Sequence, residues 1–271
     1  MKIGVNRWTM PADWSLEQCF EAAAEAGFDG IELNLAEDGP ITPESTEAQI
    51  HDEVIRPAQR NNVALTSLST GLGWKYPITS NDDTIRRKGI AVLAAGLRIA
   101  HWMGVDALLC VPGVVTSDVP YDVAYERALA ALRELAPQAA DQHVTIGVEN
   151  VWNKFLLSPM EMARFLDEVD SPWVGAYFDA GNVLVYGYPQ HWIRILGPRI
   201  KRVHVKDFRT GIGNITGFCN PLQGDLPWQE VRSALDAAGY DGFVTAEVDG
   251  YRIEPRLGLK HIAEALRAIF A

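Results

Sequence analysis

The 271-residue sequence predicts an α/β fold, a single (β/α)₈ TIM barrel, on three observations. Runs rich in β-branched residues alternate eight times with longer segments of helical periodicity, which is typical of parallel strands joined by helices. The length suits a barrel, which reaches about 250 residues as one unit. No low-complexity or Pro/Ser-rich linker interrupts the chain, so one barrel domain is expected over residues 1–271.

In the first half of the chain, glycine and proline mark the helix boundaries. Gly27 and Gly104 follow the first and third helical segments, as C-terminal caps do, and Pro43 stands at a tolerated first-turn position of the second. The expected strands are 2–8, 30–35, 63–69 and 106–112. The expected helices are 15–26, 43–61, 81–103 and 121–142.

In the second half, Ser158, Pro159 and Glu161 open a helix with a cap, a proline and an acidic first turn. The expected strands are 144–150, 173–179, 200–207 and 242–248. The remaining expected helices are 188–196, 227–239 and 258–270. Eight such units favour a closed barrel over an open doubly wound sheet. The dinucleotide fingerprint GxGxxG is also missing after the first strand, where the sequence reads NRWTMPADWS.

Charge and composition exclude several classes of partner. The net charge of −11 disfavours nucleic acid, because the protein and the phosphate backbone would repel each other. No apolar run reaches the ~18 residues of a membrane span, and the N-terminus lacks a signal-peptide pattern, so a cytoplasmic protein without a membrane partner is expected. The three cysteines are far apart, which indicates neither a disulfide framework nor structural zinc.

Polar residues end four successive strands of the predicted barrel. These residues are Glu149, Asp179, His204 and Glu247. Each alone has a structural explanation, such as a turn-forming aspartate or a buried histidine. Strand ends meet at the active-site face of a barrel, so together the four predict one site. Three carboxylates and one imidazole suit Mn²⁺, Mg²⁺ or Co²⁺, and a divalent cation would offset the repulsion between the carboxylates.

Further polar residues are expected around this site. Lys206 lies two residues after His204 and therefore faces the same way, to contact substrate or to pair with Asp207. Asn182 follows Asp179 into the mouth, and Lys154 could meet an anionic group. Candidates for the opposite side of the mouth are Arg7, Glu32 and Ser67. Aromatic loop residues that could stack on a sugar or pack locally are Trp8, Trp74, Trp152 and Phe155. The glycine-rich segment 211–220 suits a lid or a phosphate site.

The motifs GVEN, YFDAGN, HVKD and TAEV resemble those of the xylose isomerase-like barrel superfamily, and within it the ketose 3-epimerases and sugar phosphate isomerases. The resemblance spans essentially the whole chain. It implies an isomerase of carbohydrate metabolism, with manganese as the preferred metal, acting on a ketose or ketose phosphate. Glu149, Asp179, His204 and Glu247 match the family's metal ligands. The two glutamates match the pair that moves the C3 proton through a metal-bound cis-enediolate.

Three positions depart from the pattern of many ketose 3-epimerases. Asn182 replaces a histidine, Phe155 replaces a glutamate, and Thr210 replaces an arginine, although Arg209 is adjacent. These positions contact substrate in the family, and Arg209 is therefore a substrate-binding candidate with Asn182, Lys206, Lys154 and Trp8. The resemblance also implies a homodimer or homotetramer.

Three alternative functions remain open at this point. The same site could serve aldose–ketose isomerisation, or isomerisation or dehydration of inososes and keto-sugars. An abasic-site endonuclease would need several strand-end histidines, and only His204 of the six clearly ends a strand. A non-catalytic sugar-binding barrel would not need the acidic metal set.

Overall fold

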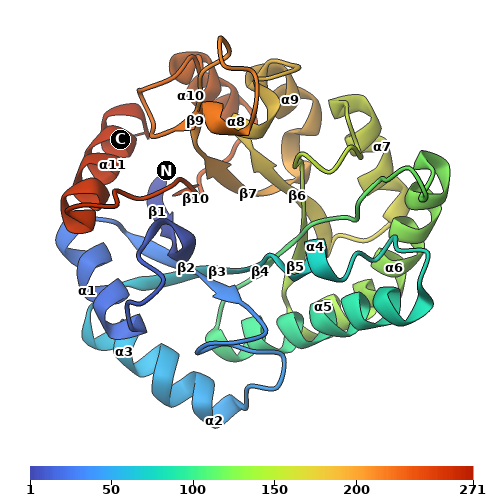
Figure 1. Cartoon of the computed structure of the whole chain (residues 1–271), viewed down its shortest axis with the longest axis horizontal. Helices are drawn as coiled ribbons and strands as arrows, with labels where there is room; N and C mark the ends of the chain where they lie inside the picture. The colour runs from blue at the N-terminus through green and yellow to red at the C-terminus, as the bar shows by residue number, and fades with distance from the viewer. Residues whose placement is uncertain (271) are drawn as a thin grey trace.

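A computed structural model describes residues 1–270 and contains the predicted closed barrel. Eight parallel strands form the ring in the order β1-β10-β7-β6-β5-β4-β3-β2, so the first and last strands close it. Figure 1 shows the helices around this ring, with the two chain ends on the same side of the molecule. The barrel strands are β1 (Lys2–Asn6), β2 (Gly30–Leu35), β3 (Ala64–Thr70), β4 (Ala107–Cys110), β5 (Thr145–Glu149), β6 (Val174–Asp179), β7 (Ile200–Val205) and β10 (Phe243–Ala246).

The outer helices begin and end largely at the caps that the sequence indicates. Ser15 forms a capping box with Gln18, and Gly27 and Gly104 take left-handed conformations after their helices. The main helices are α1 (Leu16–Ala26), α5 (Asp83–Met103), α6 (Tyr121–Gln142), α7 (Pro159–Val169), α9 (Pro189–Leu196), α10 (Trp228–Ala237) and α11 (Pro255–Phe270). Their apolar faces pack on strands that are buried on both sides, as in other parallel barrels.

The segment expected as one helix over 43–61 is built differently. It begins only at Thr46, whose side chain caps α2 (Glu47–Ile50) in a capping box with Gln49. A π-helical turn (His51–Ile55) then leads into α3 (Arg56–Arg60), where Pro57 has no N–H to continue the regular ladder. The prediction of a helix start at Pro43 was therefore wrong.

The loops at the carboxyl ends of the strands contain structure that the sequence pattern did not indicate. The expected strand over 200–207 ends at Val205, and β8 (Asp207–Phe208) leaves the barrel to pair antiparallel with β9 (Phe218–Cys219). Short helices α4 (Leu72–Lys75) and α8 (Ala180–Val183) follow β3 and β6. Within residues 1–270, no helix combines the length and apolar character that crossing a bilayer requires.

Candidate metal centre

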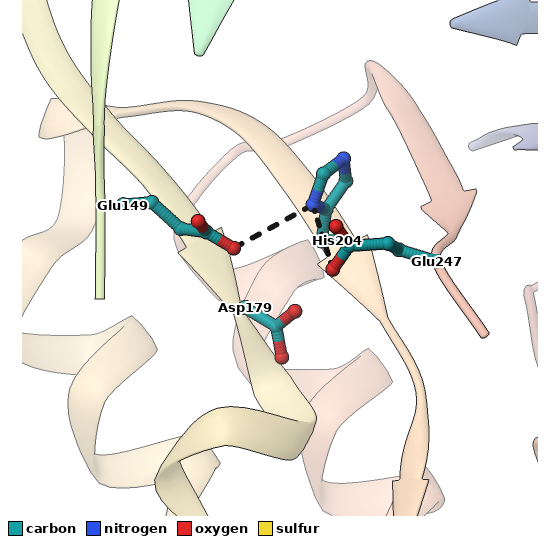
Figure 2. Close-up of side chains that lie close together, drawn as sticks. All are labelled: Glu149, Asp179, His204 and Glu247. Carbon is teal, nitrogen blue, oxygen red and sulfur yellow. Dashed lines mark ion pairs between the residues drawn. The ribbon is translucent and has the colours of Figure 1, made fainter. Parts of the chain in front are cut away.

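The four residues predicted from the strand ends meet at one point in the barrel mouth. Glu149 ends β5, Asp179 ends β6, His204 lies in β7, and Glu247 follows β10. Each contributes one ligand atom, and these four atoms lie within 4.8 Å of one another. Figure 2 shows Glu149 and Glu247 reaching in from opposite sides, with His204 and Asp179 between them.

Two hydrogen bonds from the Asn150 side chain link the neighbouring strands that bear Glu149 and Asp179. The Asn150 amide donates to the Asp179 carbonyl at 2.8 Å, and its oxygen accepts from the Asp179 N–H at 2.9 Å. Asp179 also caps α8, because its Oδ1 accepts from the N–H of Asn182 at 2.8 Å. The backbone on both sides of Asp179 is therefore held, and its Oδ2 faces the site.

His204 is oriented by a carboxylate inside the barrel. Its Nε2 lies 2.7 Å from Oε1 of Glu32, and both side chains are fully buried. Glu32 also accepts hydrogen bonds from Asn6, Ser67 and Tyr177. Although burial opposes ionisation, the His204 imidazole holds the pKa of Glu32 below its usual range. An ionised Glu32 accepts the Nε2 proton, which leaves Nδ1 as the nitrogen that faces the site.

The Nδ1 atom of His204 is buried and has no hydrogen-bond partner. The carboxylates of Glu149 and Glu247 lie 3.7 and 3.6 Å from it, which is beyond hydrogen-bond length (Figure 2). An unpaired buried nitrogen normally costs stability, and so it asks for an explanation. A cation between the nitrogen and the carboxylates would supply the missing partner.

Lys206 supplies a positive charge beside the four residues. Its Nζ lies 2.5 Å from Oδ2 of Asp179 and 2.6 Å from Oε2 of Glu247. The backbone of Gly181 makes room for it, since a Cβ there would lie 2.6 Å from Cγ of Lys206. Of the two alternatives for Lys206, substrate contact or a pair with Asp207, the pair with Asp207 does not form. Asp207 instead accepts from the N–H groups of Phe208 and Leu226 and from Nε1 of Trp228.

The two glutamates sit in unlike electrostatic environments. Burial, with a smaller contribution from the nearby Glu247 carboxylate, outweighs the lowering effect of His204 and raises the pKa of Glu149 to about 7. Burial also tends to raise the pKa of Glu247. The Lys206 ammonium and His204 outweigh this effect and hold the pKa of Glu247 below its usual range. Paired groups with separated pKa values are typical of acid–base sites.

The residues present fit a divalent cation. Three carboxylates and an imidazole nitrogen match the ligand preference of Mn²⁺, Mg²⁺ and Co²⁺ better than that of a thiolate-rich structural zinc site. The orphan Nδ1 of His204 and the acidic surroundings support the same assignment. Glu149, Asp179, His204 and Glu247 would hold the ion.

A cavity of about 630 Å³ opens above this centre. Of the predicted substrate contacts, Trp8, Asn182 and Lys206 line it, together with Trp74 and Trp152. Lys154 and Arg209 are exposed and do not line it. Segment 211–220 contributes Ile215 and Phe218 to its wall.

Five other positions from the sequence analysis lie outside the cavity lining. Phe155 is buried and packs against Tyr121, Tyr125 and Phe165. Of the two alternatives for this residue, stacking on a sugar or packing locally, it therefore packs locally. Arg7 donates to the backbone carbonyls of a neighbouring loop, and Thr210 donates to Asp225. Glu32 and Ser67 lie buried inside the barrel and do not line the mouth cavity. A charged residue on an apolar strand was the one sequence feature that could have revealed the role of Glu32.

The chain belongs to the xylose isomerase-like TIM barrel family, whose family model matches residues 20–269. Among curated relatives, the L-ribulose-5-phosphate 3-epimerase UlaE of Escherichia coli K12 is 21% identical over 250 residues, which covers 89% of this chain and 84% of UlaE.

Two solved structures share the fold. The D-psicose 3-epimerase of Clostridium cellulolyticum H10, determined with D-tagatose, has a TM-score of 0.81 at 21% identity over 99% of each chain. An L-ribulose 3-epimerase has a TM-score of 0.82 at 17% identity, over 98% of this chain and 93% of its own. These relatives are sugar 3-epimerases, which are enzymes of the isomerase class.

Proposed function

We propose that the protein is a divalent-metal-dependent isomerase that epimerises a ketose at C3, with Mn²⁺ as the preferred ion and Mg²⁺ or Co²⁺ as alternatives. The observation that carries this proposal is the convergence of four ligand atoms within 4.8 Å beneath a cavity large enough for a sugar. The substrate is a small molecule, as the names of the relatives suggest.

Glu149 and Glu247 are the proton-transfer pair. They approach from opposite sides of the site, so one can act on each face of a sugar bound between them (Figure 2). One glutamate removes the C3 proton and the other returns a proton to the opposite face, which inverts the carbon. The separated pKa values of the two residues suit this division, and such transfer is worth ~10²–10⁴ in rate.

Asp179 and His204 complete the ligand set, and the bound ion would act as a Lewis acid on the substrate oxygens. Lys206 is a further positive group at the wall of the cavity, where it can hydrogen-bond to a substrate oxygen. Asn182 also lines the cavity. Trp8, Trp74 and Trp152 offer ring faces against which a sugar can pack and from which water is excluded.

The test is isotope exchange in deuterated water. The protein is stripped with a chelator, reloaded with Mn²⁺, Mg²⁺ or Co²⁺, and incubated with a panel of ketoses. Deuterium at C3 with formation of the C3 epimer is the expected result. Exchange at C1 or C2 instead would indicate aldose–ketose isomerisation. The absence of exchange with every metal and sugar would contradict the proposed function.

A further inference from the structure

The charged groups around the mouth cavity are mostly acidic. Among residues 1–270, those that line it are Glu149, Glu247 and Asp249 on the negative side, and Lys206 on the positive side. The ammonium of Lys206 is already within 2.6 Å of two carboxylate oxygens, one from Asp179 and one from Glu247. No arginine belongs to this lining. The cavity therefore has no uncommitted cation to offer an anionic substrate.

Barrels that bind phosphate usually do so with the loops after the seventh and eighth strands. In this chain, the hydrogen-bond donors of the loop after β7 already bond to carboxylates of the protein. Asp207 accepts from the N–H groups of Phe208 and Leu226 at 2.9 and 3.0 Å. Asp225 accepts from both the N–H and the hydroxyl of Thr210, at 2.7 and 2.6 Å. A phosphate would have to displace these carboxylates.

The cations nearest in sequence to the strand ends point elsewhere. Lys154 and Arg209 lie outside the cavity lining, and Nε of Arg209 donates to the carbonyl of Gln223. Arg7 is committed to backbone carbonyls. Arg252 lines a separate depression that shares only Trp8 with the main cavity. None of these groups gives the main cavity a phosphate clamp.

The net charge of the site with a divalent ion bound also disfavours an anionic substrate. A divalent ion and Lys206 together balance Glu149, Asp179 and Glu247, which leaves the Asp249 carboxylate unbalanced at the wall. A sugar phosphate adds about −1.5 to −2 charges to this field. The remaining walls are apolar and include Trp8, Trp74 and Phe218, which favour the C–H faces of an uncharged sugar.

From these observations we infer that the substrate is an unphosphorylated, uncharged ketose. This inference rests on the proposed function and narrows it. It separates the chain from UlaE, a curated relative whose name states a phosphorylated substrate. In this chain, the features that carry the inference are the hydrogen bonds of Asp207 and Asp225 to the loop after β7 and the acidic cavity wall at Asp249.

The test compares each free sugar with its own phosphate ester on the metal-loaded protein. The probes are L-ribulose with L-ribulose 5-phosphate and D-fructose with D-fructose 6-phosphate. C3 deuterium exchange gives kcat/KM, and the fluorescence of the tryptophans lining the cavity reports binding separately from turnover. We expect kcat/KM to favour a free sugar over its ester by ~100-fold, with tighter binding of the free sugar. Equal or better turnover of an ester would overturn the inference and leave the proposed function intact.

Exchange with neither set of probes would overturn both proposals, so the two kinds of failure are distinguishable. A charge reversal tests the cause. Asp249→Lys should shift the ester-to-sugar ratio of kcat/KM upward by roughly 5-fold or more. The matched control Asp241→Lys makes the same charge change at the exposed start of β10, at the other end of the barrel, and should leave the ratio unchanged. An identical ratio in both variants, or loss of ester turnover in Arg252→Gln, would overturn the inference.

Discussion

The Glu32 carboxylate lies 2.7 Å from Nε2 of His204 inside the barrel, and this contact turns Nδ1 toward the candidate metal centre. Glu32→Gln keeps a hydrogen-bond acceptor but removes the charge. Because partners of metal-bound histidines tune ligand basicity, the affinity for Mn²⁺ should fall about 10- to 100-fold. Titration of the chelator-treated protein with Mn²⁺, followed by calorimetry, measures this change.

The matched control for this substitution is Glu37→Gln. Glu37 follows the same strand but lies at the surface, where it contacts Lys75 and Tyr76. Its replacement should leave metal affinity unchanged. If Glu32→Gln bound Mn²⁺ as tightly as the control, the contact between Glu32 and His204 would have only a structural role.

Glu149→Gln and Glu247→Gln should each reduce turnover by at least ~10²-fold, because each removes one partner of the proton-transfer pair. Steady-state assays of C3 epimerisation measure the loss, and circular dichroism confirms that the barrel is intact. Deuterium exchange distinguishes the two residues. A variant that still exchanges the C3 proton but forms no epimer has lost the glutamate that returns a proton to the opposite face of the sugar. Normal turnover in either variant would remove that residue from the mechanism.

Asp179→Asn should reduce the metal content of the purified protein most directly. Its Oδ1 still can accept from Asn182, so the cap of α8 survives while the ligand charge is lost. Elemental analysis after dialysis against a fixed Mn²⁺ concentration gives the result. Asp249→Asn, which removes a carboxylate from the cavity wall outside the ligand set, is the comparison. Equal metal content in the two variants would exclude Asp179 as a ligand.

Lys206→Met should make the protein depend more strongly on metal for stability. Without its ammonium, Asp179 and Glu247 lose their buried cation, and breaking such a pair costs about 3–5 kcal/mol. Thermal melting with a chelator or with Mn²⁺ should show a larger difference in Tm than the unchanged protein. Lys260→Met, on the exposed face of α11, is the control. A chelator effect equal to that of the control would contradict the proposed charge compensation.

The sequence predicted the barrel and the four converging residues because both depend on simple periodicities. Parallel strands all end at one face, so Glu149, Asp179 and His204 could be placed together from their positions alone. Trp8 and Asn182 line the mouth cavity for the same reason.

Contacts between loops could not be predicted in this way. Lys206 contacts Asp179 and Glu247 rather than Asp207 because the chain turns after Val205. At that turn Asp207 leaves the barrel and enters β8. Two-residue strands such as β8 and β9 have no periodicity to detect. Glu32 was visible as a charged residue on an apolar strand, but its contact with His204 spans 172 positions in sequence.

The β8–β9 hairpin lies outside the barrel ring and yet contributes Phe218 to the cavity, as the segment before it contributes Ile215. The four candidate metal ligands belong to other segments. Part of the cavity wall is thus encoded in a stretch of the chain that is separate from the candidate ligands. Exchange of residues 209–226 between relatives is a route to new sugar preferences that keeps the ligand set unaltered.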